Sequence, residues 1–250
     1  MIRIDPDNPR AVELGAALDT LLDAAALPPD LTVVLGGDGW MLSCVREGGP
    51  GQTYLGLNAG HLGFLLNDVK GDLAGAAEAV RAGRYTAWSF PRLQLTAWAP
   101  DGASLQAVAV NDVYVERSTG HTMKLRLTID GVPVVESLAT DGLIVATALG
   151  STAYSFSAGG VPCHPLVRAF QVTPICPHTP RLSSFSVPEE AEIEVLVLEP
   201  EQRPARVVSD GVDHGRIARM RVTRATPDVR LAFLAGHNMT GTLVRKILRA

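Results

Sequence analysis

The sequence predicts an α/β N-terminal domain, an all-β, sandwich-like second domain, and a C-terminal helix that returns to the first domain. Helical stripes alternate with short apolar runs in the first third of the chain. After about residue 88, extended runs follow one another with almost no helical period. The last stretch is helical again. We therefore expect residues 1–88 and about 236–250 in the first domain, and residues 89–235 in the second.

In the first domain, cap and turn residues mark the ends of the expected elements. Asn8 can cap a helix whose first position is Pro9, where a missing N–H does no harm. The apolar run Leu31–Leu35 predicts a short strand buried on both faces, and a helix should follow the glycines after it. A second short strand lies in "TYLGLNAG". An Ala-rich helix is expected at Asp72–Arg81, with Gly83 as its C-cap.

In the second domain, hairpin signals dominate. Asp-Gly lies between extended runs in "RLQLTAWAPDGASLQAVAV", "LRLTIDGVPVV" and "RVVSDGVDHG". The run "AEIEVLVLE" alternates polar and apolar residues before it becomes apolar, as a strand does. The final "TGTLVRKILRA" predicts a helix with Leu243, Ile247 and Leu248 on one face.

The composition argues against several classes of protein. With 46% hydrophobic and 19% charged residues, the 250-residue chain is typical of a globular protein. The net charge is −4 and no Lys/Arg cluster forms a basic face, so we expect no nucleic-acid partner. No apolar run approaches the roughly 20 residues that span a bilayer, and "MIRIDPDNPR" lacks the apolar stretch of a signal peptide. Three scattered cysteines fit a reducing compartment, so we expect a cytoplasmic protein without membrane partners.

The run "TVVLGGDGW" places one acid among three glycines directly after the first expected strand. Gly36, Gly37 and Gly39 let the backbone approach a ligand closely, and their N–H groups suit phosphate. Neither a Walker A sequence nor the G-x-G-x-x-G fingerprint is present. Asp38 would repel phosphate unless it accepts a hydrogen bond from a hydroxyl nucleophile or holds Mg²⁺. The alternative is a plain Gly-Asp turn.

Two further segments, "GLNAGHLGFL" and "NDVYVER", are candidates for ligand contacts. Asn58 follows a strand, and His61 lies between two glycines. The alternative here is a glycine-bent loop with a satisfied histidine. Asn111 and Asp112 lead directly into a strand, a position suited to gripping the hydroxyl groups of a ligand, although Asn-Asp is also a common turn pair.

The longest candidate is "ATDGLIVATALGSTAYSFSAGG", residues 139–160. Asp141 and the small residues from Gly150 onward bracket a strand, and such small residues let a ligand lie against the backbone. Tyr154 could stack on a base, whereas the alternative is a Ser/Gly-rich loop with a core tyrosine. The Cys and His residues within 163–178 match no usual zinc spacing, and no G-x-S-x-G elbow supports a serine hydrolase.

In this order, the segments "GGDG", "LNAGHLGFL", "ND" before a strand, "DGLIVAT", "GSTAYSFSAGG" and "TPICPH" resemble the NAD kinases, which phosphorylate the adenosine ribose 2′-hydroxyl of NAD. The resemblance runs from about residue 31 to about residue 180, with a weaker match in the C-terminal helix. GGDG alone is shared with lipid kinases, whereas "GSTAYSFSAGG" is specific to NAD kinases. The resemblance implies that Asp38 is the catalytic acid–base residue within its glycine loop. It also implies NAD contacts for Asn58, His61, Phe64, Asn111, Asp112, Asp141, Thr152, Ala153, Tyr154 and Ser157.

The resemblance further implies Mg²⁺, with ATP or polyphosphate as phosphate donor. It implies a homodimer or homotetramer in which a neighbouring subunit contributes residues to each site. No metal ligand is assigned from the sequence.

The chain departs from the family pattern mainly on the donor side. Trp40 replaces the family's Thr, Ala148-Leu149 replaces Pro-Thr, and Asp112 is one methylene shorter than the usual Glu. A catalytically degenerate NAD(H)- or NADP(H)-binding protein is therefore the alternative to an NAD kinase. We expect the Trp40 ring to turn away toward Met41 and Leu42, which leaves an active kinase with altered donor affinity.

Overall fold

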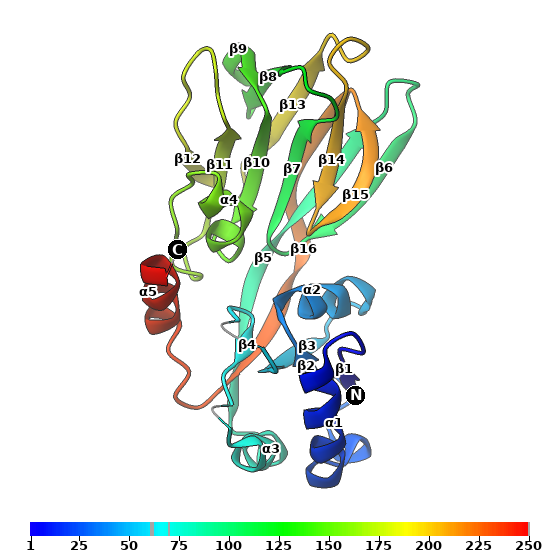
Figure 1. Ribbon diagram of the computed structural model, residues 1–250, viewed down its shortest axis with the longest axis vertical. Helices are drawn as coiled ribbons and strands as arrows, with labels where there is room; N and C mark the ends of the chain where they lie inside the picture. The colour runs from blue at the N-terminus through cyan, green and yellow to red at the C-terminus, as the bar shows by residue number, and fades with distance from the viewer. Residues whose placement is uncertain (61–62, 70, 250) are drawn as a thin grey trace. The chain divides into compact units, whose positions relative to one another are not determined.

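The computed structural model describes residues 1–60, 63–69 and 71–249, and the chain divides into two compact units (Figure 1). The first unit contains Met1–Phe90 and Pro227–Ala250, and the second contains Pro91–Thr226. The C-terminal helix belongs to the first unit, as the sequence predicts.

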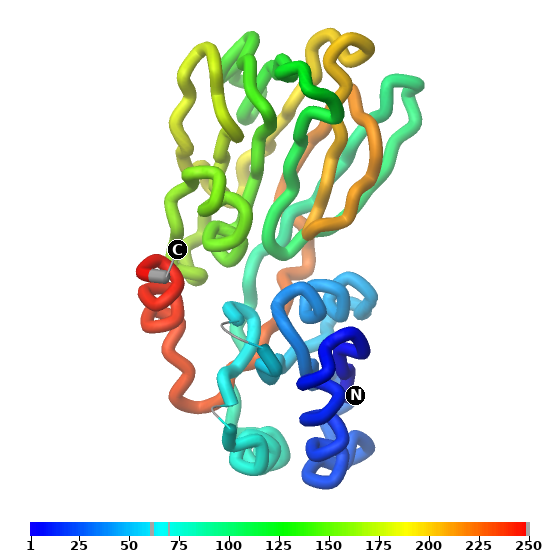
Figure 2. The backbone as a smooth tube through the Cα atoms, viewed as in Figure 1, coloured from blue at the N-terminus to red at the C-terminus, as the bar shows by residue number. Residues whose placement is uncertain are grey.

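The chain passes between the units twice, in the long strands β5 (Tyr85–Trp98) and β16 (Arg219–Leu234), which Figure 2 traces in cyan and orange. The chain returns to the first unit at Pro227, earlier than the boundary after residue 235 that the sequence predicts. The reason is that the end of β16 pairs with β3 in the sheet of the first unit.

The first unit is an α/β domain built on a parallel sheet. β1, β2 and β3 are neighbours in that order, and both β4 and the end of β16 pair with β3. Every residue of β2 and β3 is buried, which confirms strands covered on both faces. The strands are β1 (Ile2–Ile4), β2 (Leu31–Gly36), β3 (Thr53–Asn58) and β4 (Leu66–Asn67).

Helices cover both faces of this sheet. α1 and α3 share one hydrophobic core with inward side chains such as Val33 and Leu57. α2 packs on the opposite face, where a Cβ at Gly56 would lie 2.6 Å from the end of Met41. The helices of this unit are α1 (Pro9–Leu21), η1 (Ala24–Ala26), α2 (Asp38–Glu47), α3 (Leu73–Arg81) and α5 (Met239–Arg249).

Local caps set the helix ends. The Asn8 side chain accepts hydrogen bonds from two N–H groups of the first turn of α1, at 3.1 and 3.2 Å. The Asp72 side chain caps α3 in the same way, and Gly83 follows that helix with φ +65°. α2 begins at Asp38 and not after the glycines, because Gly37 takes the cap position with an extended backbone, φ −113° and ψ 178°. Asp38 therefore stands in the first turn of a helix.

The second unit is a β-sandwich, in which two sheets enclose one hydrophobic core. Side chains from both sheets, such as Val113, Phe170 and Leu125, contribute to that core. One sheet has the order β12-β11-β10-β7-β14-β15, with strands Phe185–Pro188, Ala169–Ile175, Gly142–Thr147, Asp112–Arg117, Ala205–Ser209 and Val212–Ile217. The other contains β5, β16, β6 (Ser104–Ala109), β8 (Met123–Ile129), β9 (Val132–Thr140) and β13 (Ile193–Leu198).

All three predicted Asp-Gly hairpins are confirmed. They join β5 to β6, β8 to β9 and β14 to β15. In Asp130-Gly131 and Asp210-Gly211 both residues have positive φ, at 49° and 75° and at 44° and 79°. A type I′ hairpin turn requires this combination, and Asp followed by Gly supplies it at low cost.

Among the helices of the described residues, none combines the length and the apolar character that crossing a membrane requires.

Candidate active site

Asp38 is held in place by the backbone of the loop that follows β3. Its carboxylate accepts hydrogen bonds from the Phe64 N–H, at 2.9 and 3.0 Å to the two oxygens, and from the Leu65 N–H at 2.9 Å. The Phe64 side chain itself is buried, with 6% of its surface exposed. The loop therefore orients the acid through its main chain.

The three glycines around Asp38 have different surroundings. A Cβ at Gly36 would lie 2.9 Å from the Trp40 ring, so this glycine permits close packing. Gly37 and Gly39 have no atom within 4 Å of the corresponding position, so they face open space. Because the N–H groups of a first helical turn have no partner within the helix, this end of α2 suits an anion.

The Trp40 ring lies against Gly36 and beneath the Arg3 guanidinium, whose central carbon is 5.6 Å from the ring centroid. Its indole N–H is buried and has no hydrogen-bond partner among the described residues. The ring thus lies on Gly36 and under Arg3, and no atom of it comes within 4 Å of a Cβ built at Gly37.

Asn58 lies beside Gly36 at the carboxyl edge of the sheet, since the two residues are partners in the β2–β3 register. It is buried, with 7% exposed, and its side-chain oxygen accepts the Gly60 N–H at 2.8 Å. This hydrogen bond holds the start of the loop whose later residues, Phe64 and Leu65, contact Asp38. His61 lies outside the described residues.

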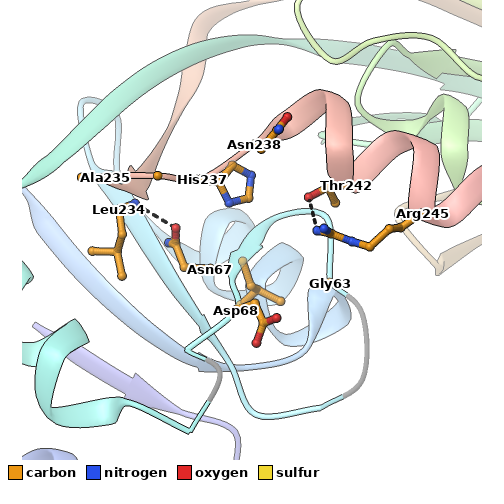
Figure 3. A pocket seen from close by; sticks show the side chains of 11 residues that line it. Gly63, Asn67, Asp68, Leu234, Ala235, His237, Asn238, Thr242 and Arg245 are labelled. Atoms are coloured by element: carbon orange, nitrogen blue, oxygen red, sulfur yellow. Dashed lines mark hydrogen bonds between the residues drawn. The ribbon is translucent and has the colours of Figure 1, made fainter.

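A cavity of about 320 Å³ opens next to this loop within the first unit (Figure 3). Gly63 and Asp68 line it on one side, and His237, Thr242 and Arg245 line it on the other. A Cβ at Gly63 would lie 3.1 Å from an oxygen of Asp38, so the carboxylate lies close behind this part of the cavity wall. No sequence motif predicts the cavity, because its walls come from residues 63–68 and 234–245, which lie far apart in the sequence.

In the second unit, Asn111 and Asp112 stand at the start of β7, where Asp210 holds their backbone. The Asp210 carboxylate accepts hydrogen bonds from the N–H groups of Val110, Asn111 and Asp112, at 2.7, 2.8 and 3.2 Å. The sequence identifies Asp210 only as a hairpin residue. Its second role arises because β14 pairs with β7.

The two side chains of this pair are buried polar groups. Asp112 is 5% exposed, and burial, followed by the nearby Asp210 carboxylate, raises its pKa to about 7. The side-chain oxygen of Asn111 is buried without a hydrogen-bond partner among the described residues. A ligand hydroxyl would satisfy this oxygen.

The loop after β10 packs directly on the Asn111-Asp112 pair. A Cβ at Gly150 would lie only 2.1 Å from the Asn111 carbonyl oxygen, so glycine is required for this approach. The Thr147 hydroxyl donates to the Val110 carbonyl at 2.7 Å and accepts the Gly150 N–H at 3.0 Å. Two segments far apart in the sequence thus form one surface.

The short helices η2 (Gly150–Thr152) and α4 (Tyr154–Ser157) carry the remaining predicted contacts. Tyr154 is 36% exposed and meets the Tyr114 ring edge-on, with centroids 4.9 Å apart. Ser157 is exposed and Ala153 is half-buried. Thr152 is buried, and its hydroxyl donates to the Leu149 carbonyl at 3.5 Å.

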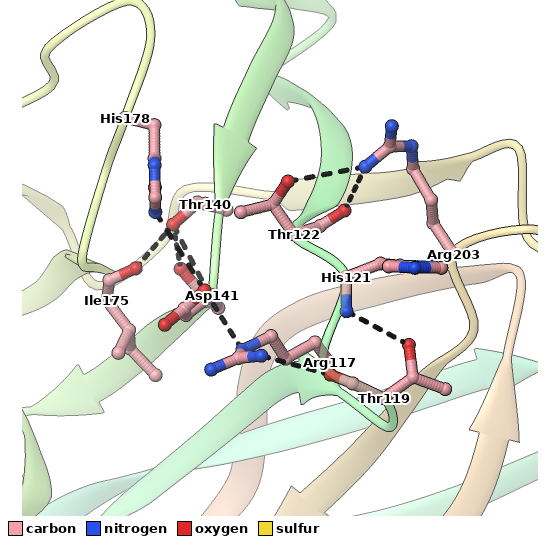
Figure 4. Close-up of polar contacts among 10 residues, drawn as sticks. Arg117, Thr119, His121, Thr122, Thr140, Asp141, Ile175, His178 and Arg203 are labelled. Atoms are coloured by element: carbon pink, nitrogen blue, oxygen red, sulfur yellow. Dashed lines mark hydrogen bonds and ion pairs between the residues drawn. The ribbon is translucent and has the colours of Figure 1, made fainter.

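Asp141 is separated from these residues within one chain. It precedes β10, whereas Asp112 pairs with Ala146 near the other end of that strand. At about 3.4 Å per residue, the separation is roughly 15 Å or more. The Asp141 carboxylate instead pairs with Arg117 at 3.0 Å and approaches His178 at 4.0 Å (Figure 4).

Among the described residues, no group of three or more His, Cys, Asp and Glu side chains is arranged to hold a metal ion. A magnesium ion at a kinase site keeps several waters and takes most other ligands from phosphates, so it needs one or two carboxylates only. Asp68, which lines the cavity beside the Asp38 loop, meets that smaller requirement.

The candidate segments of the second unit fall within a known family model. The model described as ATP-NAD kinase C-terminal domain matches residues 110–231. The NAD kinase of Aromatoleum aromaticum is 35% identical over 223 residues, which cover 87% of this chain and 73% of that protein. The chain belongs to the NAD kinase family. This confirms the resemblance seen in the sequence, and it makes the chain a member of a phosphotransferase family.

Solved structures of the NAD kinase family share the fold. The crystal structure of an NAD kinase from Archaeoglobus fulgidus in complex with ATP has a TM-score of 0.78 at 25% identity, over 100% of this chain and 98% of that one. Yeast NADH kinase complexed with NADH has a TM-score of 0.77 at 27% identity, over 89% of this chain and 66% of that one. The α/β unit followed by a β unit and a C-terminal helix is thus the architecture of this NAD kinase family.

Proposed function

We propose that this chain transfers a phosphoryl group from ATP or polyphosphate to the adenosine ribose 2′-hydroxyl of NAD, which yields NADP. One observation supports this most strongly. The Asp38 carboxylate is fixed by three N–H contacts at the start of α2, next to two glycines that face open space. An oriented acid beside an anion-binding helix end is what a hydroxyl-directed kinase needs.

Asp38 has room for one directed contact to the substrate. A carboxylate has about four lone-pair positions, and the contacts from Phe64 and Leu65 use three of them. The remaining position, on Oδ2, would accept the 2′-hydroxyl. Because phosphoryl transfer passes through a loose transition state, aligning this hydroxyl is the larger contribution, and accepting its proton late is the smaller one.

The donor phosphates would lie at the open side of Gly37 and Gly39. The N–H groups at the start of α2 donate to phosphate oxygens, and the helix dipole favours their negative charge. Asp68 would hold Mg²⁺ together with those phosphates and water. When bound, Mg²⁺ neutralises charge on the donor oxygens.

The second unit would bind NAD. The unpartnered oxygen of Asn111 and the buried carboxyl of Asp112 suit ribose hydroxyls. Tyr154, exposed on the neighbouring loop, suits a base, and Ala153 and Ser157 provide a small surface beside it. Thr152 supports this loop from inside.

The position of Asp141 favours an oligomer. Because it stands at the far end of β10 from Asp112, it would contact NAD only if it belonged to a neighbouring subunit's site. We therefore propose a homodimer or homotetramer. Sedimentation velocity tests whether the protein is such an oligomer. We expect Asp141→Ala to lower NAD affinity without dissociating the assembly.

We also propose that the protein works in the cytoplasm, because Cys44, Cys163 and Cys176 are all free thiols.

A coupled assay for NADP formation tests the function, with ATP and polyphosphate in parallel and NAD and NADH as acceptors. NADP formation with either donor supports a kinase. Binding of NAD without NADP formation would favour a catalytically degenerate binding protein. The position of the Trp40 ring, on Gly36 and under Arg3, supports the kinase.

A further inference from the structure

Lys246 on α5 lies beside the GGDG acid and has no role in the function described so far. Its ammonium nitrogen is 4.3 Å from the centroid of the Phe64 ring. The backbone of the same Phe64 donates to both oxygens of Asp38. The last helix of the chain therefore brings a positive charge to the loop that orients the catalytic carboxylate.

This ammonium is partly dehydrated and is not neutralised by a contact pair. Burial lowers the pKa of Lys246, and the Asp38 carboxylate acts in the opposite direction. No ion pair of Lys246 is found within residues 1–60, 63–69 and 71–249. An ammonium that has lost water without gaining a paired anion favours the approach of an anionic ligand.

Arg245 adds a second positive charge in the adjoining cavity. Its guanidinium donates to the Thr242 hydroxyl at 3.0 Å, and the close-up shows both side chains on the cavity wall (Figure 3). No carboxylate pairs with Arg245 in the described part of the chain. Guanidinium groups match phosphate oxygens in geometry as well as in charge.

The cavity has the size and the position for a phosphate chain. Its volume of about 320 Å³ lies at the lower end of the range for small-molecule sites, roughly 300–1,000 Å³. Gly63 lies between the cavity and Asp38, and Asp68 provides a carboxylate on the same side, across from Arg245. A bare anion would be repelled by Asp68, whereas a phosphate chain carrying Mg²⁺ would not.

We propose that α5 is a donor-binding element of this kinase, in which Lys246 contacts the phosphoryl group in transfer and Arg245 contacts the phosphate that leaves. This rests on the proposed function, because it requires a phosphate donor beside Asp38. The 2′-oxygen forms a bond to phosphorus while the bond from that phosphorus to the bridging oxygen breaks. The leaving phosphate departs with the electron pair, and the hydroxyl proton passes to Asp38. The two cations stabilise the charge on the donor oxygens throughout.

The test uses Lys246→Gln and Arg245→Gln, each titrated by calorimetry with inorganic tripolyphosphate in the presence of Mg²⁺ and, separately, with NAD. Loss of one charge-assisted contact should weaken tripolyphosphate binding about 10- to 100-fold. The donor KM at saturating NAD should rise by a similar factor, while NAD affinity stays within about twofold. Lys246→Arg should retain most of the donor affinity.

Two matched controls are available in the second unit. Lys124 pairs with Glu199 at 2.9 Å, and Arg216 donates to the Pro200 carbonyl at 3.2 Å. Lys124→Gln and Arg216→Gln remove the same charges away from the first unit and should leave donor binding unchanged. Thermal melts confirm that each variant is folded.

Wild-type affinity for tripolyphosphate in both variants would overturn the inference. A fall in NAD affinity with unchanged tripolyphosphate binding would also overturn it, because the cations would then serve the pyrophosphate of NAD. A wild-type protein that forms no NADP with any donor defeats the proposed function itself. A wild type that forms NADP and is indifferent to both substitutions defeats only the role of α5.

Discussion

In the first unit, Gly37 and Gly39 face open space beside Asp38, whereas in the second unit Gly150 and Gly160 are tightly enclosed. A Cβ would lie 2.1 Å from the Asn111 carbonyl oxygen at Gly150, and 2.3 Å from the Ser155 hydroxyl oxygen at Gly160. The open glycines leave room for a ligand, and the enclosed ones let two segments of the protein meet. Glycine-rich motifs that look alike in the sequence therefore have different physical purposes.

The acidic residues Asp38 and Asp112 also differ in their surroundings. Asp38 is half-buried and rests on backbone N–H groups, which hold its orientation. Asp112 is buried near a second carboxylate, Asp210, which itself accepts three backbone N–H bonds. The first arrangement presents a charged group to a substrate, and the second keeps a polar group inside the protein until a ligand contacts it. This comparison predicts that a substitution of Asp38 changes the rate, whereas substitutions around Asp112 change NAD binding and stability.

The largest expected effect is that of Asp38→Asn. We expect kcat to fall about 10²–10⁴-fold, because the amide can neither accept the proton nor align the hydroxyl as well. NAD affinity, measured by calorimetry, should remain close to that of the wild type. A loss of kcat below about fivefold, set against that range, would show that Asp38 is not the acid–base residue.

Gly150→Ala should destabilise the protein by about 3 kcal/mol, because the new methyl group meets a backbone oxygen that cannot move aside easily. Gly37→Ala adds the same methyl group to open space and serves as the matched control, with an expected change in unfolding free energy below about 1 kcal/mol. Urea denaturation of both variants gives the two values. Equal stabilities would remove the distinction between enclosed and open glycines.

Tyr154→Ala should weaken NAD binding by about 1–3 kcal/mol, since a stacked base contributes that much in comparable systems. The rate of the bound reaction should change less. Tyr114→Phe, which keeps the ring against which Tyr154 packs, is the control. If Tyr154→Ala and wild type bind NAD equally, Tyr154 is part of the packing and not of the ligand site.

Asp112→Asn should change how stability depends on pH. The pKa of Asp112 is raised from 3.8 to about 7, so the folded protein keeps a proton that the unfolded chain has lost between about pH 4 and pH 7. Stability therefore falls as pH rises through this window. The Asn variant lacks this contribution, so its unfolding free energy relative to wild type should increase from pH 5 to pH 8, by on the order of 2 kcal/mol. A constant difference over that range would show that Asp112 titrates normally.

The smallest expected effect is that of Trp40→Thr. The ring lies on Gly36 and under Arg3, so its loss should cost about 0.5–1 kcal/mol of cation–π energy. A threonine would add a hydroxyl at the start of α2, so the donor KM should change severalfold while NAD binding stays constant. If wild type forms no NADP and Trp40→Thr does, the active-kinase proposal fails and the binding-protein alternative replaces it.

The local structure and the family of this protein can be predicted from its sequence. Asn8 and Asp72 cap helices, and the Asp-Gly pairs turn hairpins, because these preferences act over a few residues. The buried strand ahead of GGDG follows from its apolar run, and the motif series identifies an NAD kinase. Such features need no knowledge of where distant segments lie.

Contacts between residues far apart in the sequence, in contrast, become visible in the folded chain alone. Asp210 supports residues about 100 positions earlier, and Lys246 reaches the ring of Phe64 from the last helix. Asp141 is in the same motif region as Tyr154, yet the register of β10 and β7 separates it from Asp112. These relations depend on strand order and helix packing, where burial of apolar surface determines the arrangement and no local preference records the partner.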